Sequence, residues 1–283
     1  MSRLRRFAFI VIGLCTLGAS LSLAQAPTAF PTPSVLIPEV LNSYPHDPQA
    51  FTQGLLWHAG SLYESTGLRG ESSLRRVALE TGEVEQKIMV SRPADQLTGA
   101  NALPDYFAEG LALVDERLIQ LTWTEGEAFV YDLNDFERLE TFNYTGEGWG
   151  LCYDGRFLFH SDGSPYLSLR DPESFELLVK FVVTIEGQAL QSGLLNELEC
   201  VGDYVYGNLW QTDYIVQIDK FTGVITAIID ARQLLSAEER AALDPNAVLN
   251  GIAYNPETDT FYITGKKWSR LFEVRFVPSP STP

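Results

Sequence analysis

The chain has 283 residues, of which 45% are hydrophobic and 20% charged, and its formal net charge is −17. This composition is too apolar for an intrinsically disordered protein, and it supplies enough hydrophobic side chains for a packed core in one or two domains. The strong negative charge argues against nucleic acids and anionic membrane surfaces as partners, and it suits a solvated acidic surface.

The first 26 residues have the pattern of a secretory signal peptide. A basic start with Arg3, Arg5 and Arg6 precedes an apolar run, and the small residues AQA that end at Ala26 are typical of a cleavage site. Removal of this segment takes away three arginines and no acidic residue, so the net charge becomes −20. We therefore expect an exported protein, periplasmic or secreted, without stable membrane association after cleavage. A retained membrane anchor is the alternative, and residues 27–33 are expected to form a linker.

One strand pattern is written five times in the rest of the chain. Each copy is a mostly apolar run, and the copies read TQGLLW, FAEGLAL, GWGLCY, LNELEC and LNGIAY. One position differs in chemistry from copy to copy and holds Gln53, Glu109, Trp149, Asn196 and Asn250. These positions are separated by 56, 40, 47 and 54 residues, which indicates a repeat protein.

A second and a third strand follow each copy across short turns, and a fourth strand follows in four of the five units. The turns contain hairpin-forming residues such as Asp154-Gly155 and Gly202-Asp203. Four-stranded units at these intervals are typical of a β-propeller, and five units predict five blades. An ordinary β-sandwich with coincidentally similar strands is the alternative.

The fifth unit has only three strands and ends at LFEVRF, residues 271–276. The apolar stretch SVLIPEVLNSY at 34–44 precedes the first unit and can supply the missing outer strand, which would remove an exposed sheet edge. We therefore expect an all-β protein, a five-bladed propeller over residues 34–276 closed by its N-terminal strand, with a disordered tail at 277–283. Residues 234–244 are predicted to contain a helix, because Ser236 is a favourable N-cap with a glutamate three residues later.

Two cysteines remain after removal of the signal, Cys152 and Cys200. Export would allow a disulfide. The cysteines lie in two copies of the strand pattern, one position out of register, and residues one apart on a strand face opposite sides of the sheet. This favours two separate buried thiols over a bridge.

Equivalent positions on the inner strands of a propeller face one another around its axis. The second strands end beside the starts of the first strands, and there the sequence places Trp123, Asp162, Trp210 and Lys266. A partly desolvated Glu109 in such aromatic surroundings would have a raised pKa and could transfer protons near neutral pH. Lys266 could stabilise an oxyanion, while the indole rings would supply apolar walls and cation–π faces. Packing or surface solvation explains each residue alone, but their convergence favours a functional site.

Other catalytic chemistry has little support in the sequence. The histidines His46, His58 and His160 lack metal-ligand spacing, and no P-loop, G-x-S-x-G or dinucleotide-binding motif occurs. We therefore expect no metal and no cofactor.

Several stretches, in order, resemble the glutaminyl-peptide cyclotransferases of the plant and bacterial type. They are YPHDPQAFTQGLLW, FAEGLAL, GEGWGLCYDG, LNELEC, GNLWQTD, LNGIAY and FYITGKKWSRLFEV, and the resemblance runs from about Val40 to Phe276. It implies a five-bladed propeller that converts the N-terminal glutamine of peptides or proteins to pyroglutamate with loss of ammonia. We expect it to act as a monomer. Some members of the family carry a structural metal ion, for which this sequence shows no clear ligand set.

The resemblance also implies roles for individual residues. Glu109 matches the catalytic glutamate, and Asn196 and Lys266 would stabilise the tetrahedral oxyanion. Asp162 and Asn250 are added because the repeated strands place them around the same axis. The expected substrate-binding residues are Phe51, Gln53, Trp123, Trp149, Asp162, Trp210 and Asn250.

Two other functions are compatible with these residues. A metal-dependent propeller hydrolase, such as a lactonase, would use Glu109, Asn196 and Asn250 to bind an axial Ca²⁺. A non-catalytic exported binding platform would turn over no glutaminyl peptide.

Overall fold

The computed structural model describes residues 30–98, 102–191 and 195–280, so the predicted signal peptide at 1–26 lies outside the described residues. The described part is almost entirely β-structure, with one short helix, α1 (Ala237–Ala242). Within it, no helix has the length and apolar character needed to cross a membrane.

Three four-stranded antiparallel sheets follow one another along the chain. The first contains β2 (Thr52–His58), β3 (Ser61–Thr66), β4 (Ser73–Val77) and β5 (Val84–Met89). The second contains β6 (Ala108–Val114), β7 (Arg117–Thr122), β8 (Glu127–Asp132) and β9 (Arg138–Asn143). The third contains β10 (Leu151–Tyr153), β11 (Leu158–Ser161), β12 (Tyr166–Arg170) and β13 (Leu177–Val182). In each sheet the strands pair in sequence order, as short hairpin turns between them require.

The remaining strands form a small hairpin and an eight-stranded sheet. The hairpin joins β14 (Thr184–Ile185) and β15 (Gln188–Ala189). The large sheet has the order β16-β17-β18-β19-β1-β22-β21-β20. Its strands are β16 (Leu195–Val201), β17 (Tyr204–Leu209), β18 (Tyr214–Asp219), β19 (Ile225–Asp230), β1 (Ser34–Pro45), β22 (Arg270–Pro278), β21 (Thr260–Gly265) and β20 (Leu249–Asn255).

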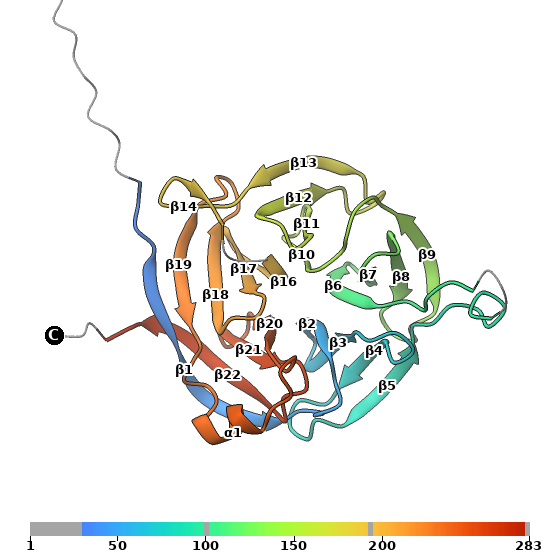
Figure 1. Cartoon of the computed structure of the whole chain (residues 1–283), viewed down its shortest axis with the longest axis horizontal. Coiled ribbons are helices and arrows are strands. Elements are labelled where there is room, and N and C mark those ends of the chain that lie inside the picture. Colours follow the sequence, from blue (N-terminus) through green and yellow to red (C-terminus); the bar gives the residue numbers. More distant parts are fainter. Residues whose placement is uncertain (1–29, 99–101, 192–194, 281–283) are drawn as a thin grey trace, which may run out of the picture. The chain divides into compact units, whose positions relative to one another are not determined.

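Segments from the two ends of the chain meet in this large sheet. β1 pairs antiparallel with β22 between Leu36 and Pro45, and it pairs parallel with β19 over Ser34–Leu36. Figure 1 shows β1 running along the outside of β22, so that the beginning and end of the described chain lie side by side.

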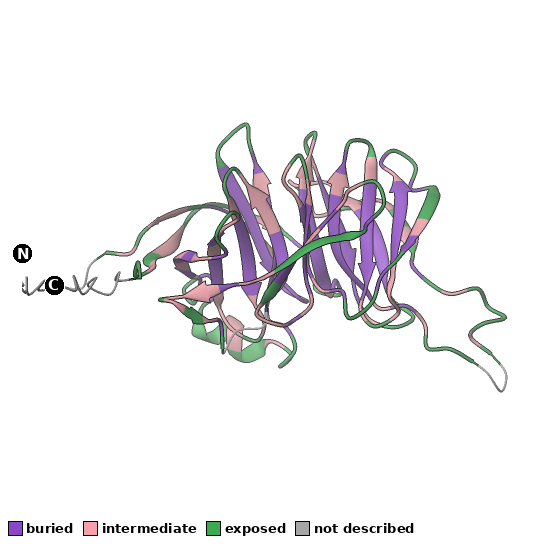
Figure 2. Cartoon of the chain, turned by 90° about the horizontal axis from the view of Figure 1, so that it is seen from above, coloured by how far each residue is buried: buried purple, intermediate pink, exposed green. Residues whose placement is uncertain are grey.

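The first strands of the repeated units surround a common centre. Figure 1 shows β2, β6, β10, β16 and β20 gathered there, and each contacts the next, with β20 contacting β2 in turn. The inner strands thus form a nearly closed, barrel-like arrangement. Figure 2 shows that the strands are largely buried, while the connecting loops carry most of the exposed residues.

The glycine of the strand pattern lies where neighbouring inner strands approach backbone to backbone. A Cβ added at Gly54 would lie 2.5 Å from the nitrogen of Leu111, and one added at Gly110 would lie 2.5 Å from the nitrogen of Leu151. These positions therefore exclude any side chain. In the fourth copy Glu197 takes the place of the glycine. Its carboxylate accepts hydrogen bonds from the backbone N–H groups of Leu55, at 3.3 Å, and Ile252, at 2.8 Å.

Hydrophobic clusters lie between successive sheets, and the sheets on either side cover both faces of the inner strands. Leu55 packs into the cluster that contains Tyr262, whereas the next residue, Leu56, packs into the cluster that contains Phe129. Successive strand residues point to opposite faces, so each inner strand contributes to two clusters. This explains why the strand pattern is apolar at nearly every position.

Cys152 of β10 and Cys200 of β16 form a disulfide, with their Cα atoms 5.4 Å apart, so the expectation of two separate thiols is wrong. Neighbouring sheets stack through opposite faces. Leu151 packs toward the second sheet, while Cys152 packs with Leu198 toward the fourth unit. Two side chains meet between neighbouring sheets when they point to opposite faces of their strands, as Cys152 and Cys200 do.

Replacing both cysteines with alanine should lower the free energy of unfolding by about 2–4 kcal/mol, because the bridge closes a loop between positions 48 residues apart and restricts the unfolded chain. Denaturant unfolding with and without reductant measures this loss. The reduced wild type serves as the control and should match the double variant. Equal stability of the oxidised and reduced wild type would contradict the prediction.

Two predicted boundaries can be compared with the structure. Ser236 caps α1, and its side chain and that of Glu239 form a reciprocal capping box, which confirms the helix signal in the sequence. The disordered tail predicted to start at residue 277 is wrong for its first two residues. β22 continues to Pro278, and the N–H of Ser279 donates to the carbonyl of Val35 at 3.0 Å.

Candidate active site

A cavity of about 230 Å³ lies where the first strands begin and the second strands end. Its volume is many times the ~30 Å³ share of one water molecule, and it is smaller than the roughly 300–1,000 Å³ of pockets for drug-sized ligands. Its size therefore suits one amino-acid residue at the end of a peptide. The residues that line it are Phe51, Gln53, Phe107, Glu109, Trp123, Trp149, Asn196, Trp210 and Lys266.

Glu109 lies at the second position of β6 with only 4% of its surface exposed. Its Oε1 accepts a hydrogen bond from Gln53 Nε2 at 3.0 Å, while its buried Oε2 has no partner among the described residues. Burial raises the pKa of this carboxyl well above its usual value; the charge of Lys266 opposes the shift, and Glu125 and Glu147 add to it. A raised pKa makes this carboxyl group a stronger proton acceptor than an ordinary surface carboxylate.

Asn250 supports this carboxyl group from behind the cavity wall. It is fully buried and does not line the cavity, contrary to the sequence-based expectation. Its Nδ2 donates to the carbonyl of Thr52 at 2.9 Å and to Oε1 of Gln53 at 3.4 Å. Gln53 is thereby oriented with its own amide nitrogen toward Glu109.

Lys266 and Asn196 are the other buried polar groups of the cavity. Lys266 follows directly after β21, is 3% exposed, and places its ammonium group 4.8 Å from the centre of the Phe51 ring. Burial lowers the pKa of Lys266 to about 8, although Glu109 favours its charged form. The amide oxygen of Asn196 is buried without a partner in the described part of the chain, and an amide offers both a donor and an acceptor to a substrate.

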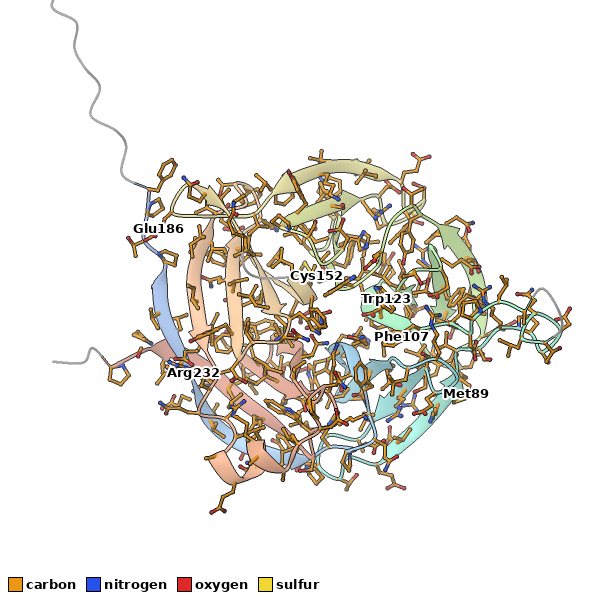
Figure 3. All side chains as sticks on the ribbon, viewed as in Figure 1. Met89, Phe107, Trp123, Cys152, Glu186 and Arg232 are labelled. Atoms are coloured by element: carbon orange, nitrogen blue, oxygen red, sulfur yellow. A yellow bond between two sulfur atoms is a disulfide. The ribbon has the colours of Figure 1, made fainter. Side chains whose placement is uncertain are left out.

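Five rings form the sides of the cavity, and we call them the aromatic collar: Phe51, Phe107, Trp123, Trp149 and Trp210. Three edge-to-face contacts occur within it, with ring centres 6.0 Å apart for Phe51–Phe107, 5.6 Å for Phe107–Trp123 and 5.4 Å for Trp149–Trp210. Figure 3 shows Phe107 and Trp123 close together near the centre of the molecule. The collar offers apolar contact and cation–π faces.

Phe107 is the lining residue that the sequence analysis missed. It stands two residues before Glu109, as Phe51 stands two residues before Gln53. Aligning the repeated strands at the position two residues before Gln53 and Glu109 would have found Phe107.

Asp162 does not lie on the cavity wall, although its place at the end of a second strand led us to expect it there. Its carboxylate pairs with Lys180 of β13 at 2.6 Å and accepts a hydrogen bond from the Ser164 hydroxyl. The chain turns at Gly163, whose φ is 74°, and a Cβ there would lie 2.6 Å from the ring of Trp149. The third unit therefore places backbone against this ring.

The fold and the cavity together define an all-β protein with a buried carboxyl group in an aromatic cavity, an arrangement suited to an enzyme. The model of the glutamine cyclotransferase family matches residues 12–276. The chain belongs to this family, as the sequence resemblance implied.

Two relatives agree with this assignment. The glutaminyl-peptide cyclotransferase of Arabidopsis thaliana is 38% identical over 243 residues, which cover 84% of this chain and 70% of that protein. The crystal structure of Myxococcus xanthus glutaminyl cyclase matches with a TM-score of 0.77 and 38% identity, and the match covers 88% of this chain and 100% of that one.

Proposed function

We propose that the protein converts the N-terminal glutamine of peptides or proteins to pyroglutamate with release of ammonia, and that Glu109 is the general acid and base. The observation that carries this proposal concerns Oε2 of Glu109, which has no hydrogen-bond partner among the described residues. It is buried in the cavity that the aromatic collar, Lys266 and Asn196 line. Family membership supports the same reaction.

Binding would use the charge and the apolar surface of the cavity. An N-terminal ammonium group, with a pKa of about 7.7–8.0 in the free peptide, would bind at Oε2 of Glu109. The methylene groups of the glutamine side chain would pack against the aromatic collar. Holding the side chain folded back toward its own amine raises the effective concentration of the nucleophile.

The chemical step would be an intramolecular attack. Glu109 accepts a proton from the ammonium group, and the neutral nitrogen forms a bond to the γ-carboxamide carbon. Lys266 and Asn196 stabilise the negative oxygen of the tetrahedral intermediate. This attack closes the five-membered ring. Glu109 then passes a proton to the amide nitrogen as its bond to carbon breaks, so ammonia leaves and the carbonyl group re-forms. The ring nitrogen loses its excess proton to Glu109 or water, and the net reaction balances as glutaminyl peptide to lactam plus ammonia.

Ammonia release from a glutamine-initiated dipeptide tests the function directly. An N-acetylated dipeptide of the same sequence is the matched control, since its blocked nitrogen cannot attack. Release from both or from neither would overturn the proposal; release from neither would favour a binding platform. Turnover should also persist in EDTA, because no three His, Cys, Asp or Glu side chains form a metal-binding group among the described residues. Loss in EDTA without unfolding would favour the hydrolase.

We also propose that the sheets are the five blades of a propeller and that β1 is the outer strand of the last blade. Under this proposal the eight-stranded sheet counts as two blades joined at β19 and β1. The pairing of β1 with β22 and the hydrophobic clusters between successive sheets support it.

Deleting residues 34–44 should then lower the melting temperature and expose the edge of β22. Thermal unfolding by circular dichroism measures the effect, and truncation of residues 280–283, which keeps the hydrogen bond from Ser279 to Val35, is the control. A deletion variant that melts like the control would contradict the closure.

Export and a monomeric state complete the proposal. The sequence of residues 1–26 supports export, and so does the Cys152–Cys200 disulfide, because disulfides persist mainly in oxidising compartments.

A further inference from the structure

The aromatic collar is made of two arcs that a single side chain connects. Phe51, Phe107 and Trp123 contact one another in series, and Trp149 contacts Trp210. Oε2 of Glu147 accepts hydrogen bonds from Nε1 of Trp123 and from Nε1 of Trp149, both at 2.8 Å. Glu147 is exposed and does not line the cavity, so it holds the two indoles from outside.

The backbone around Glu147 is fixed to the same two strand ends. The N–H of Gly148 donates to the carbonyl of Trp123 at 2.8 Å, and the N–H of Trp149 donates to the carbonyl of Ser161 at 3.0 Å. The hydroxyl of Tyr144 donates to the carbonyl of Thr122. The carboxylate therefore extends from a loop whose position relative to Trp123 is already set.

The two indoles differ in their other supports. The ring of Trp149 lies against Gly163 on one side and contacts Trp210 edge-on, whereas Trp123 has Phe107 as its aromatic neighbour. Loss of the carboxylate would thus free Trp123 more than Trp149.

We propose that Glu147 is a positioning residue that joins the two arcs of the collar and sets the spacing of Trp123 and Trp149 around the glutamine side chain. This inference rests on the proposed function for its effect on substrate, but the joining of the arcs is a property of the free protein. Charged acceptors make stronger hydrogen bonds than neutral ones, so the carboxylate holds both indoles better than an amide would.

Three variants test the proposal. Glu147→Ala removes both hydrogen bonds, and Glu147→Gln keeps a neutral acceptor in the same place. Glu125→Gln is the matched control, because Glu125 also acts electrostatically on Glu109 but pairs with Arg69 instead of an indole. The two readouts are the indole N–H resonances of the substrate-free protein and the separate kcat and KM for a glutaminyl dipeptide.

We expect Glu147→Ala to move the indole N–H signals of Trp123 and Trp149. It should also raise KM roughly tenfold, because both indoles lose the hydrogen bond that fixes their spacing around the substrate, with kcat changed much less. The indole signals and KM of Glu147→Gln should lie between those of the wild type and the alanine variant, and Glu125→Gln should leave the indole signals and KM unchanged.

Unmoved indole signals in folded Glu147→Ala would overturn the proposal, and so would an equal rise of KM in Glu125→Gln. If the alanine variant does not fold, the glutamine variant decides by the same two readouts. The resonances need no turnover, so failure of the ammonia assay would reject the function without deciding the role of Glu147.

Discussion

Replacement of Glu109 by glutamine is expected to lower kcat by roughly 10²–10⁴-fold, the usual contribution of a general acid–base group. The amide keeps the shape of the side chain and can still meet Gln53, but it cannot accept the proton of the substrate amine. KM should rise less than kcat falls, because the ammonium group loses its charged partner while the aromatic collar still binds the glutamine side chain. Steady-state ammonia release measures both constants.

The same substitution makes a distinct prediction for stability. An ionised carboxylate that is buried without a full set of partners opposes folding, so a neutral amide at this position should leave the melting temperature unchanged or raise it. A variant that is inactive and also destabilised would point to a structural role for Glu109. A folded Glu109→Gln protein with near wild-type kcat would reject its catalytic role.

Replacement of Lys266 by methionine is expected to lower kcat by roughly 10²–10³-fold, as removal of one oxyanion-stabilising group does elsewhere. The pKa of Lys266 is about 8, so its positive charge is present below that pH and lost above it. Activity of the wild type should therefore decline above about pH 8. At the acid end, activity should fall as Glu109 becomes protonated below its raised pKa.

The pH profiles of two Lys266 variants separate charge from packing. Lys266→Arg keeps its charge at every pH of the assay, so the alkaline decline should move to higher pH. Lys266→Met removes the charge that lowers the pKa of Glu109, so its acid limb should also move to higher pH. An unchanged alkaline limb in a folded, active Lys266→Arg enzyme would show that Lys266 does not set it.

The meeting of Gln53, Glu109, Trp149 and Asn196 could be predicted because a repeated strand pattern places equivalent residues at equivalent points. That argument needs only the sequence period and the alternation of side chains. The same reasoning does not predict the direction of a side chain that lies beyond the end of a strand. Asp162 points to Lys180 because Gly163 turns the chain at that point, and the sequence alone does not give the direction of that turn.

Contacts between sheets were the other limit of the sequence analysis. Alternation shows that Cys152 and Cys200 face opposite sides of equivalent strands, but only the stacking of neighbouring units turns those sides toward each other. Asn250 shows a similar limit. Its place among the five equivalent strand positions followed from the repeat, but its side-chain rotation, which turns it toward Gln53 and away from the cavity, did not.

The burial of Glu109 among partly exposed rings bears on when in the life of a polypeptide this enzyme can act. Oε2 of Glu109, which has no partner in the described part of the chain, is buried in the cavity that the aromatic collar lines. A glutamine within a chain has no free amine to bring there. A hydrolytic cut that exposes glutamine at a new terminus must therefore come first. Once the lactam has formed, that terminus carries no positive charge and offers nothing to exopeptidases that recognise a free amine, so the reaction fixes the point at which trimming stops.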